Sequence, residues 1–257
     1  NKKNVVVKQI GMEIFSSKNE NKDDKEILDT SIKIIKKIGF KKANVKIGNF
    51  KLFELLIKKL SMPQRWKSRL LKFYWNEKYF SELLKRLQSN SDIDPIVVAG
   101  DKKNYLKMKK ENPNKIIAGR SYREIIERYE RKINDPRTVE TGKYSVKIIR
   151  EFLKIKCSLK DAPKKLNTFY KKYNLNISVG KDFFPISNLK QKGINFEFST
   201  SNGRGKDVEY YSSFIFSIEV RFKNSIKTLV AGGRYNDLTS KILGLKKIPA
   251  VGAAINL

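Results

Sequence analysis

The sequence predicts an α+β fold, with an antiparallel sheet built from the two ends of the chain and a long helical block inserted between them. Three observations support this prediction. The first is that residues 4–16 have the composition of a strand. The second is that residues 17–190 carry apolar side chains mostly at helical spacing. The third is that residues 191–257 change to strand-like alternation, so the first strand must pair with the last ones across the insertion.

Within the insertion, the apolar spacing predicts a series of helices. Each shows a start or stop signal or an apolar stripe: Ile27–Ile38 closed by Gly39, Phe50–Leu60 capped by Asn49, a helix after Pro63, Tyr79–Leu87, a capping box at Ser121–Glu124 opening a helix to Ile133, then Tyr144–Ile155 and Leu166–Tyr173. Residues 44–47 favour a short strand. The polar, Lys-rich residues 102–114 favour a loop.

In the C-terminal block, residues 208–222 alternate between apolar and polar, as a half-buried strand does. Phe196 and Phe198, followed by a Ser-Asn-Gly turn, predict its hairpin partner. A third strand is expected over residues 227–231, and another apolar element begins at Pro249.

Composition excludes several kinds of chemistry. The 257 residues contain no His and one Cys, so a Ser-His-Asp triad, a His-ligated metal and an internal disulfide framework are ruled out. No metal or cofactor is expected. No apolar stretch is long enough to span a membrane and no signal peptide is visible, so we expect a cytoplasmic location without a membrane partner.

The charge is strongly basic, with 56 Lys and Arg against 26 Asp and Glu. Clustered basic residues bind phosphates, which makes an RNA-binding module one interpretation. Most of the basic residues are Lys, however, whereas bidentate phosphate recognition favours Arg. A solvated Lys-rich surface from an AT-rich genome is the interpretation we favour.

The first strand carries the clearest local signal of a binding site. Alternation places Gln9, Gly11 and Glu13 on one face, offering an amide, an open backbone and a carboxylate. A ligand-binding face and a plain solvent-facing edge are both compatible with this pattern.

Three further segments are candidates. The Tyr210-Tyr211 pair gives one ring to each face of a strand, either for a site or as ordinary strand formers. Gly232-Gly233 followed by Arg234 and Tyr235 suits an anion held beside a close backbone approach, or a simple turn. The Gly-rich, basic turn with Arg204 and Lys206 lacks Walker A spacing but could face an anion.

Taken together, four of these segments resemble the histidyl-tRNA synthetase family and its paralogues, the regulatory subunits of ATP phosphoribosyltransferase. The segments, in order, are Lys8–Phe15, which is similar to the end of class II motif 2; Val208–Tyr211 and Ala231–Leu238, which are similar to the two histidine-binding elements; and Ile248–Ala253, which is similar to the run into motif 3. The resemblance implies a class II synthetase-like sheet and a cytoplasmic protein of histidine biosynthesis.

The resemblance also implies site residues. Gln9 and Glu13 would bind histidine from the sheet floor, Tyr210 and Tyr211 would contact the imidazole, and Arg234 and Tyr235 would line the same pocket. Arg204 and Lys206 would be candidate anion-binding residues.

Departures from the family pattern favour the regulatory paralogue. Lys206-Asp207 stands where the synthetase has Arg-Gly facing the activated phosphate, and residues 60–75 resemble the helical insertion of alphaproteobacterial regulatory subunits. The resemblance therefore implies an allosteric, self-associating subunit without catalytic residues of its own, whose partner is a short-form catalytic subunit. An active synthetase that binds tRNA is the alternative. Class II motif 1 and the motif 3 Arg have no counterpart, so we expect the chain to be part of a longer protein.

Overall fold

The computed structural model describes residues 8–16, 18–110, 116–117, 119–180, 183–184, 186, 191–204, 210–244 and 246–256. The chain forms two compact units, one from residues 1–59 and 151–257 and the other from residues 60–150. We call them the sheet unit and the helical unit. The sheet unit extends beyond the expected core of residues 1–16 and 191–257. It also contains α1, β2 and α2, which precede the helical unit in the sequence, and α8, which follows it.

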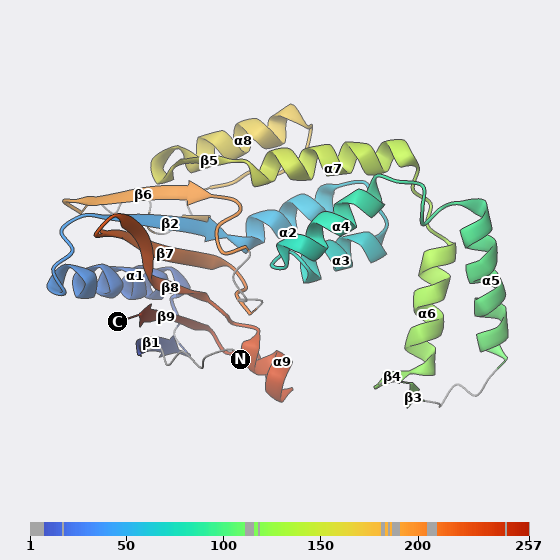
Figure 1. Ribbon diagram of the computed structural model, residues 1–257, viewed down its shortest axis with the longest axis horizontal. Coiled ribbons are helices and arrows are strands. Elements are labelled where there is room, and N and C mark those ends of the chain that lie inside the picture. The colour runs from blue at the N-terminus through green and yellow to red at the C-terminus, as the bar shows by residue number, and fades with distance from the viewer. Residues whose placement is uncertain are drawn as a thin grey trace. The chain divides into compact units, whose positions relative to one another are not determined.

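The sheet unit is built on seven strands in the order β1-β9-β8-β7-β2-β6-β5 (Figure 1). Their bounds are β1 Gln9–Phe15, β2 Ala43–Asn49, β5 Lys156–Ser158, β6 Ile194–Ser199, β7 Phe214–Phe222, β8 Ser225–Arg234 and β9 Ala250–Asn256. As predicted, the first strand pairs antiparallel with the last, with Gln9 opposite Asn256 and Phe15 opposite Ala250.

Two strand predictions were wrong. Phe196 and Phe198 lie in β6, which is not the hairpin partner of β7, because β2 runs between them, parallel to β6 and antiparallel to β7. The sheet is therefore mixed. The long strand begins at Phe214, and residues 210–213 precede it as irregular chain.

The alternation in β7 also fails at its start, where Ile215 and Ser217 are as buried as Phe214 and Phe216. The turn after β6 explains this burial. Asn202 donates from its side-chain amide to the Lys46 carbonyl (3.1 Å), and a Cβ on Gly48 would meet the Asn202 Cβ at 2.9 Å. The turn thus covers the face of β2 and β7 that was expected to meet solvent.

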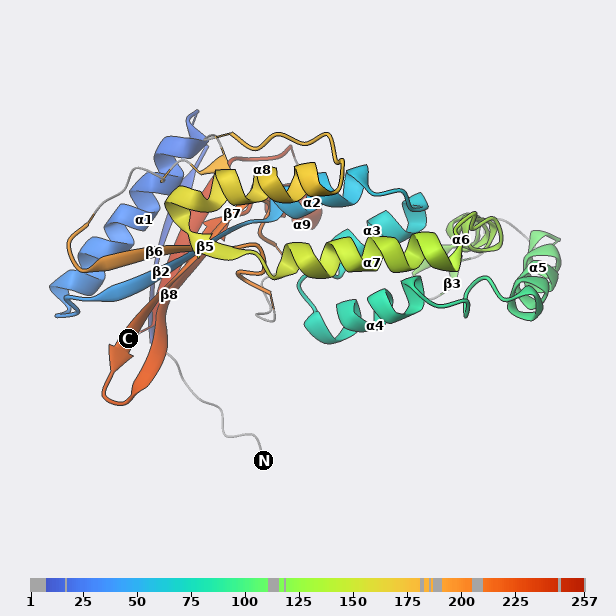
Figure 2. The same cartoon turned by 90° about the horizontal axis from the view of Figure 1, so that it is seen from above.

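One helix, α1 (Glu20–Lys37), covers one face of the sheet and packs against β1, β7, β8 and β9 (Figure 2). Its apolar stripe of Ile27, Leu28, Ile32 and Ile35 is buried, as the spacing predicted. Asn19 caps it by accepting the Lys22 N–H at 3.1 Å. We call this side of the sheet the α1 face, and the opposite side the open face.

The remaining elements of the sheet unit are α2 (Phe50–Lys59), the 3₁₀ turn η1 (Leu159–Asp161), α8 (Ala162–Lys172) and α9 (Leu238–Leu243). At the start of α2 the Asn49 side chain accepts the Lys51 N–H at 3.0 Å, which agrees with its predicted capping role.

The helical unit contains α3 (Gln64–Lys72), α4 (Glu77–Leu87), α5 (Pro95–Lys109), α6 (Tyr122–Ile133) and the short pair β3 (Ile116–Ile117) and β4 (Arg120–Ser121); α7 (Val139–Leu153) runs on into the sheet unit. The capping box at Ser121 and Glu124 is present. The loop expected over 102–114 was wrong for residues 102–109, which belong to α5. That helix buries none of its residues, so it has no apolar stripe to reveal it.

A buried ionic network joins the helices of this unit around Asp135. Its Oδ2 accepts from Arg65 Nη2 (2.8 Å), Trp66 Nε1 (2.8 Å) and Arg137 Nε (3.1 Å). Burial opposes ionisation of Asp135, but the hydrogen bonds from Trp66 and Arg65 outweigh it and lower the pKa of the carboxyl. Arg137 also donates to the Leu87 and Ser89 carbonyls, closing the C-terminal end of α4.

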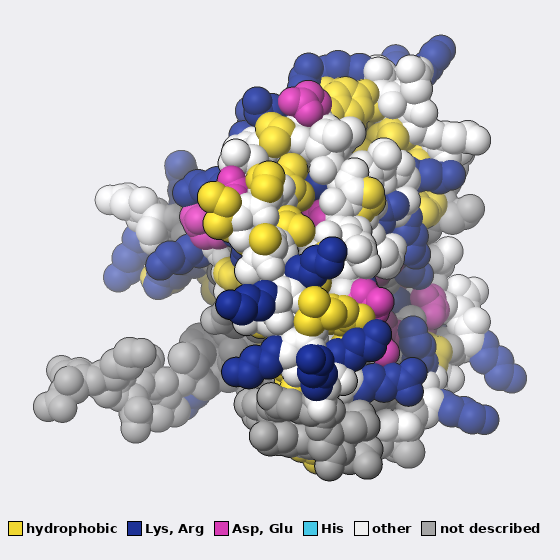
Figure 3. Space-filling model, turned by 90° about the vertical axis from the view of Figure 1, so that its right-hand side faces the viewer, with side chains coloured by type: hydrophobic (Ala, Val, Ile, Leu, Met, Phe, Trp, Pro, Cys, Tyr) yellow, Lys and Arg dark blue, Asp and Glu magenta, His cyan; other side chains and the backbone are white. Residues whose placement is uncertain are grey.

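No helix among the described residues is both long and apolar enough to cross a membrane. In the face of the molecule shown in Figure 3, Lys and Arg side chains are spread out with apolar and acidic side chains between them.

Candidate functional site

The candidate site lies on the open face, where β1, β9 and β8 run side by side. Register places Glu13 opposite Gly252 and Gly252 opposite Gly233, so one carboxylate and two glycines form a row across three strands. Directly opposed residues point to the same face of a sheet. The Glu13 side chain therefore lies over a floor without side chains.

The two glycines are required by close contacts. A Cβ on Gly252 would overlap the Glu13 carboxylate, and a Cβ on Gly233 would stand 2.9 Å from two carbons of the Tyr211 ring and 2.6 Å from the Phe214 carbonyl oxygen. Gly11, on the same face, has nothing within 4 Å of such a position. The floor is thus occupied by Glu13 and Tyr211 at one end and is open at the other.

Three tyrosines gather around Glu13. The Tyr235 hydroxyl donates to Glu13 Oε2. The Tyr210 ring lies 4.6 Å from the Tyr211 ring and 5.9 Å from the Tyr235 ring, the latter pair edge-to-face at 83°. We call Glu13, Tyr210, Tyr211 and Tyr235 the tyrosine cluster.

The phenol groups of Tyr211, which is buried, and Tyr235, which is half-buried, stay protonated at neutral pH. Burial and then a hydrogen bond with Tyr210 raise the pKa of Tyr211, which is 7% exposed. Burial, followed by the hydrogen bond to Glu13, raises the pKa of Tyr235. The cluster therefore offers neutral hydroxyl groups and aromatic faces beside one carboxylate.

The other sequence-predicted site residues lie elsewhere. Gln9 shares the open face but stands four residues along β1 from Glu13, about 13 Å away by strand geometry, and its side-chain amide donates to Asn256 at 2.7 Å. Arg204 lies in the turn after β6, where its N–H donates to the Ser201 carbonyl. Lys206 lies outside the described residues.

Arg234 points to the α1 face, opposite the tyrosine cluster. It is 1% exposed, and its guanidinium donates to Asp24 Oδ1 (2.9 Å), the Asn236 side chain (3.2 Å) and the Glu20 carbonyl (2.8 Å). The structure thus separates Arg234 from its neighbour Tyr235, with which it was expected to line one pocket. It ties the strand to the first turn of α1 instead.

Sequence reasoning missed several participants. Phe15 packs edge-to-face on Tyr235 at 6.3 Å, and Gly252 makes room for Glu13. Both lie within or opposite a strand already singled out, so alternation and pairing could have indicated them. Glu20 and Asp24 look like ordinary acidic residues near the start of a helix, and nothing local links them to Arg234.

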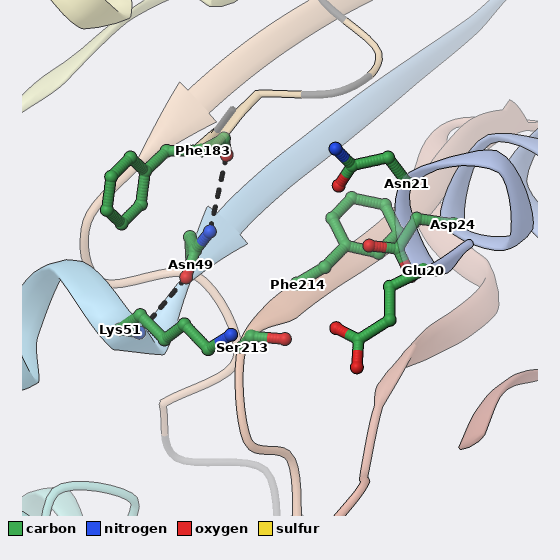
Figure 4. A pocket seen from close by; sticks show the side chains of 8 residues that line it. All are labelled: Glu20, Asn21, Asp24, Asn49, Lys51, Phe183, Ser213 and Phe214. Atoms are coloured by element: carbon green, nitrogen blue, oxygen red, sulfur yellow. Dashed lines mark hydrogen bonds between the residues drawn. The ribbon is translucent and has the colours of Figure 1, made fainter. Parts of the chain in front are cut away.

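A pocket of about 210 Å³ opens on the α1 face, between the first turn of α1, the start of α2 and the start of β7 (Figure 4). Its walls carry both acidic and basic side chains, including Glu20, Asp24 and Lys51. Burial raises the pKa of Asp24 to about 6, although Arg234 opposes the shift. Within the described part of the chain, no group of His, Cys, Asp and Glu side chains is arranged to hold a metal ion.

Comparison with known proteins identifies relatives along nearly the whole chain. The ATP phosphoribosyltransferase regulatory subunit of Allorhizobium ampelinum is 26% identical over 262 residues, covering 96% of this chain and 70% of that protein. The same subunit of Rhizobium meliloti is 24% identical over 250 residues, covering 91% of this chain and 65% of that protein. The chain is homologous to these regulatory subunits. It spans about two thirds of their length, and no protein-family model matches it.

Among solved structures, the histidyl-tRNA synthetase from Nostoc sp. PCC 7120 superposes with a TM-score of 0.52 at 16% identity, covering 96% of this chain and 47% of that one. At this identity the likeness concerns the fold alone. It agrees with the class II synthetase-like sheet that the sequence resemblance implies.

Proposed function

We propose that this chain is a histidine-sensing regulatory subunit of ATP phosphoribosyltransferase, acting in the first step of histidine biosynthesis. The observation that carries the proposal is the tyrosine cluster, in which the Tyr235 hydroxyl meets Glu13 on an open, side-chain-free floor. The homology to regulatory subunits over 96% of the chain supports it.

The tyrosine cluster has the chemistry that histidine needs. The Glu13 carboxylate can accept a hydrogen bond from an ammonium or imidazole N–H, and charged acceptors make the stronger hydrogen bonds. The Tyr235 hydroxyl donates its proton to Glu13, and its oxygen, like the Tyr211 oxygen, can accept a hydrogen bond from an imidazole or ammonium N–H. Their rings provide flat apolar walls for the imidazole.

The cluster suits binding better than phosphate chemistry. Arg234 directly precedes Tyr235 in the sequence, but its guanidinium is hydrogen-bonded to Asp24 and Asn236 on the other face of the sheet. Of the described cluster residues, Glu13 is the one charged group, and it would repel a phosphate. We therefore propose that the chain senses histidine and leaves catalysis to a separate short-form catalytic subunit.

Regulation on this proposal is a coupling free energy between the tyrosine cluster and the partner's active site. Histidine bound here would change the partner's activity, and the partner's ligands would change histidine affinity in return. Self-association of this chain belongs to the same proposal.

The test is a reconstitution of the full-length protein with the short-form catalytic subunit. We expect ATP phosphoribosyltransferase activity that depends on this protein and is inhibited by L-histidine, with the inhibition lost in Glu13→Ala. The same preparation should show no histidine-dependent exchange between ATP and pyrophosphate. Robust exchange would overturn the proposal in favour of an aminoacylating enzyme.

A further inference from the structure

The pocket on the α1 face is separate from the tyrosine cluster. Phe214 in its wall belongs to the start of β7 on the α1 face, whereas Glu13 and Tyr211 lie on the open face. At about 210 Å³ the pocket is smaller than the roughly 300–1,000 Å³ pockets that hold drug-sized ligands. It therefore suits a small molecule.

One end of the pocket attracts a cation. The Asp24 side chain is 6% exposed, and both of its contacts with Arg234, at 2.9 and 2.7 Å, use Oδ1. Within the described chain, Oδ2 has no hydrogen bond, and the carboxylate points into the hollow in Figure 4. Glu20 lies beside it, 39% exposed, with Oε1 accepting from the Asn236 amide at 2.7 Å. Because Oδ2 faces the pocket without a protein donor, it can accept a hydrogen bond from a ligand N–H.

The other end attracts an anion. Lys51 is exposed in the first turn of α2, and its side chain extends along the pocket toward Ser213 (Figure 4). In the part of the chain that the structure describes, its ammonium forms no salt bridge. The ten-residue helix behind it directs the positive end of its dipole to the same place.

The two ends together select the ligand class. A simple amine would be repelled by Lys51 and a simple anion by Glu20 and Asp24, whereas a molecule with both charges satisfies both ends. The Phe214 ring contributes an apolar wall beside Asp24. We propose that this pocket binds a free α-amino acid as a zwitterion, with its ammonium on Glu20 and Asp24 and its carboxylate on Lys51. This site is independent of the histidine site proposed for the tyrosine cluster.

The experiment uses the full-length protein carrying Glu13→Ala, which weakens the response of the tyrosine cluster. Calorimetry is run with each of the twenty L-amino acids, and with the decarboxylated amine and the deaminated acid of any that bind. We expect at least one amino acid to bind at concentrations up to about 10 mM, and at least tenfold more tightly than either of its analogues.

Variants then locate the site. Lys51→Met and Glu20→Gln should each weaken binding about tenfold, and the side-chain carbonyl introduced by Glu20→Gln would still accept from the Asn236 amide. Lys59→Met, an exposed lysine at the far end of the same helix, is the matched control and should leave affinity within about twofold. The proposal is overturned if no amino acid binds, if the amine binds as tightly as the amino acid, or if Lys51→Met behaves like Lys59→Met.

Discussion

Gly233 offers a direct test of how the tyrosine cluster is packed. An alanine Cβ there would lie 2.9 Å from the Tyr211 ring and 2.6 Å from the Phe214 carbonyl oxygen, whereas ordinary contacts begin at about 3.4 Å. The ring must retreat by about half an ångström, and β7 must also shift to relieve the contact with its Phe214 carbonyl. Overpacking of this kind costs about 1–3 kcal/mol of the free energy of unfolding.

Gly11→Ala is the matched control, because it adds the same methyl group to the same face of the sheet, where nothing lies within 4 Å. For a protein of this size, about 1–3 kcal/mol corresponds to a fall in Tm of roughly 2–12 °C. Scanning calorimetry of the full-length protein should show that fall for Gly233→Ala. For Gly11→Ala, the free energy of unfolding should change by no more than about 0.5 kcal/mol. Equal melting of the two variants would refute the packing of Tyr211 over Gly233.

Three more measurements test individual contacts in the structure. Arg137→Met removes a donor from the buried Asp135 carboxylate and from the end of α4, and urea unfolding should show a loss of about 3–5 kcal/mol; a loss below about 1 kcal/mol would contradict the network. Tyr235→Phe deletes the hydroxyl that donates to Glu13, so titration with L-histidine should show affinity weakened about tenfold, or about 1.4 kcal/mol; undiminished affinity would exclude that hydroxyl from the site. The pKa of Asp24 is raised from 3.8 to about 6, so its contribution to stability is present below about pH 4 and is lost as pH rises through 6, by on the order of 3 kcal/mol. The stability of the native protein relative to Asp24→Asn should therefore fall between about pH 4 and pH 7, and a constant difference would contradict this.

The helices were predictable where one face of each is buried. The apolar spacing of Ile27 to Ile35 identified α1, and the capping box at Ser121 identified the start of α6. The helix α5 was not predicted, because the spacing of apolar residues indicates a helix only when one of its faces packs against a core. No residue of α5 is buried. A solvated helix and a polar loop have the same composition.

The pairing of the first and last strands of the chain was predictable, whereas the order of the strands from the middle of the sheet was not. Alternation indicated that Glu13 and Gly11 share a face, and the pairing of β1 with β9 is the long-range contact that the architecture requires. The order of β6, β2 and β7 was not predictable, because β2 comes from a distant part of the chain and separates strands that are neighbours in sequence.

The same limit applies to the site. Glu13 and the three tyrosines were each singled out from the sequence, and the structure brings them together. The sequence could not show that Arg234 faces away from them. Its side chain is held by Asp24, 210 residues away, and alternation says which residues share a face but not which face a helix covers.

Calorimetric titration of the full-length protein with L-histidine tests the central claim most directly. The native protein should bind histidine, Glu13→Ala should weaken binding by more than about tenfold, or about 1.4 kcal/mol, and Glu26→Ala, at an exposed position on α1, should leave it unchanged. Equal affinity of the native protein and Glu13→Ala would contradict the assignment of the tyrosine cluster as a histidine site.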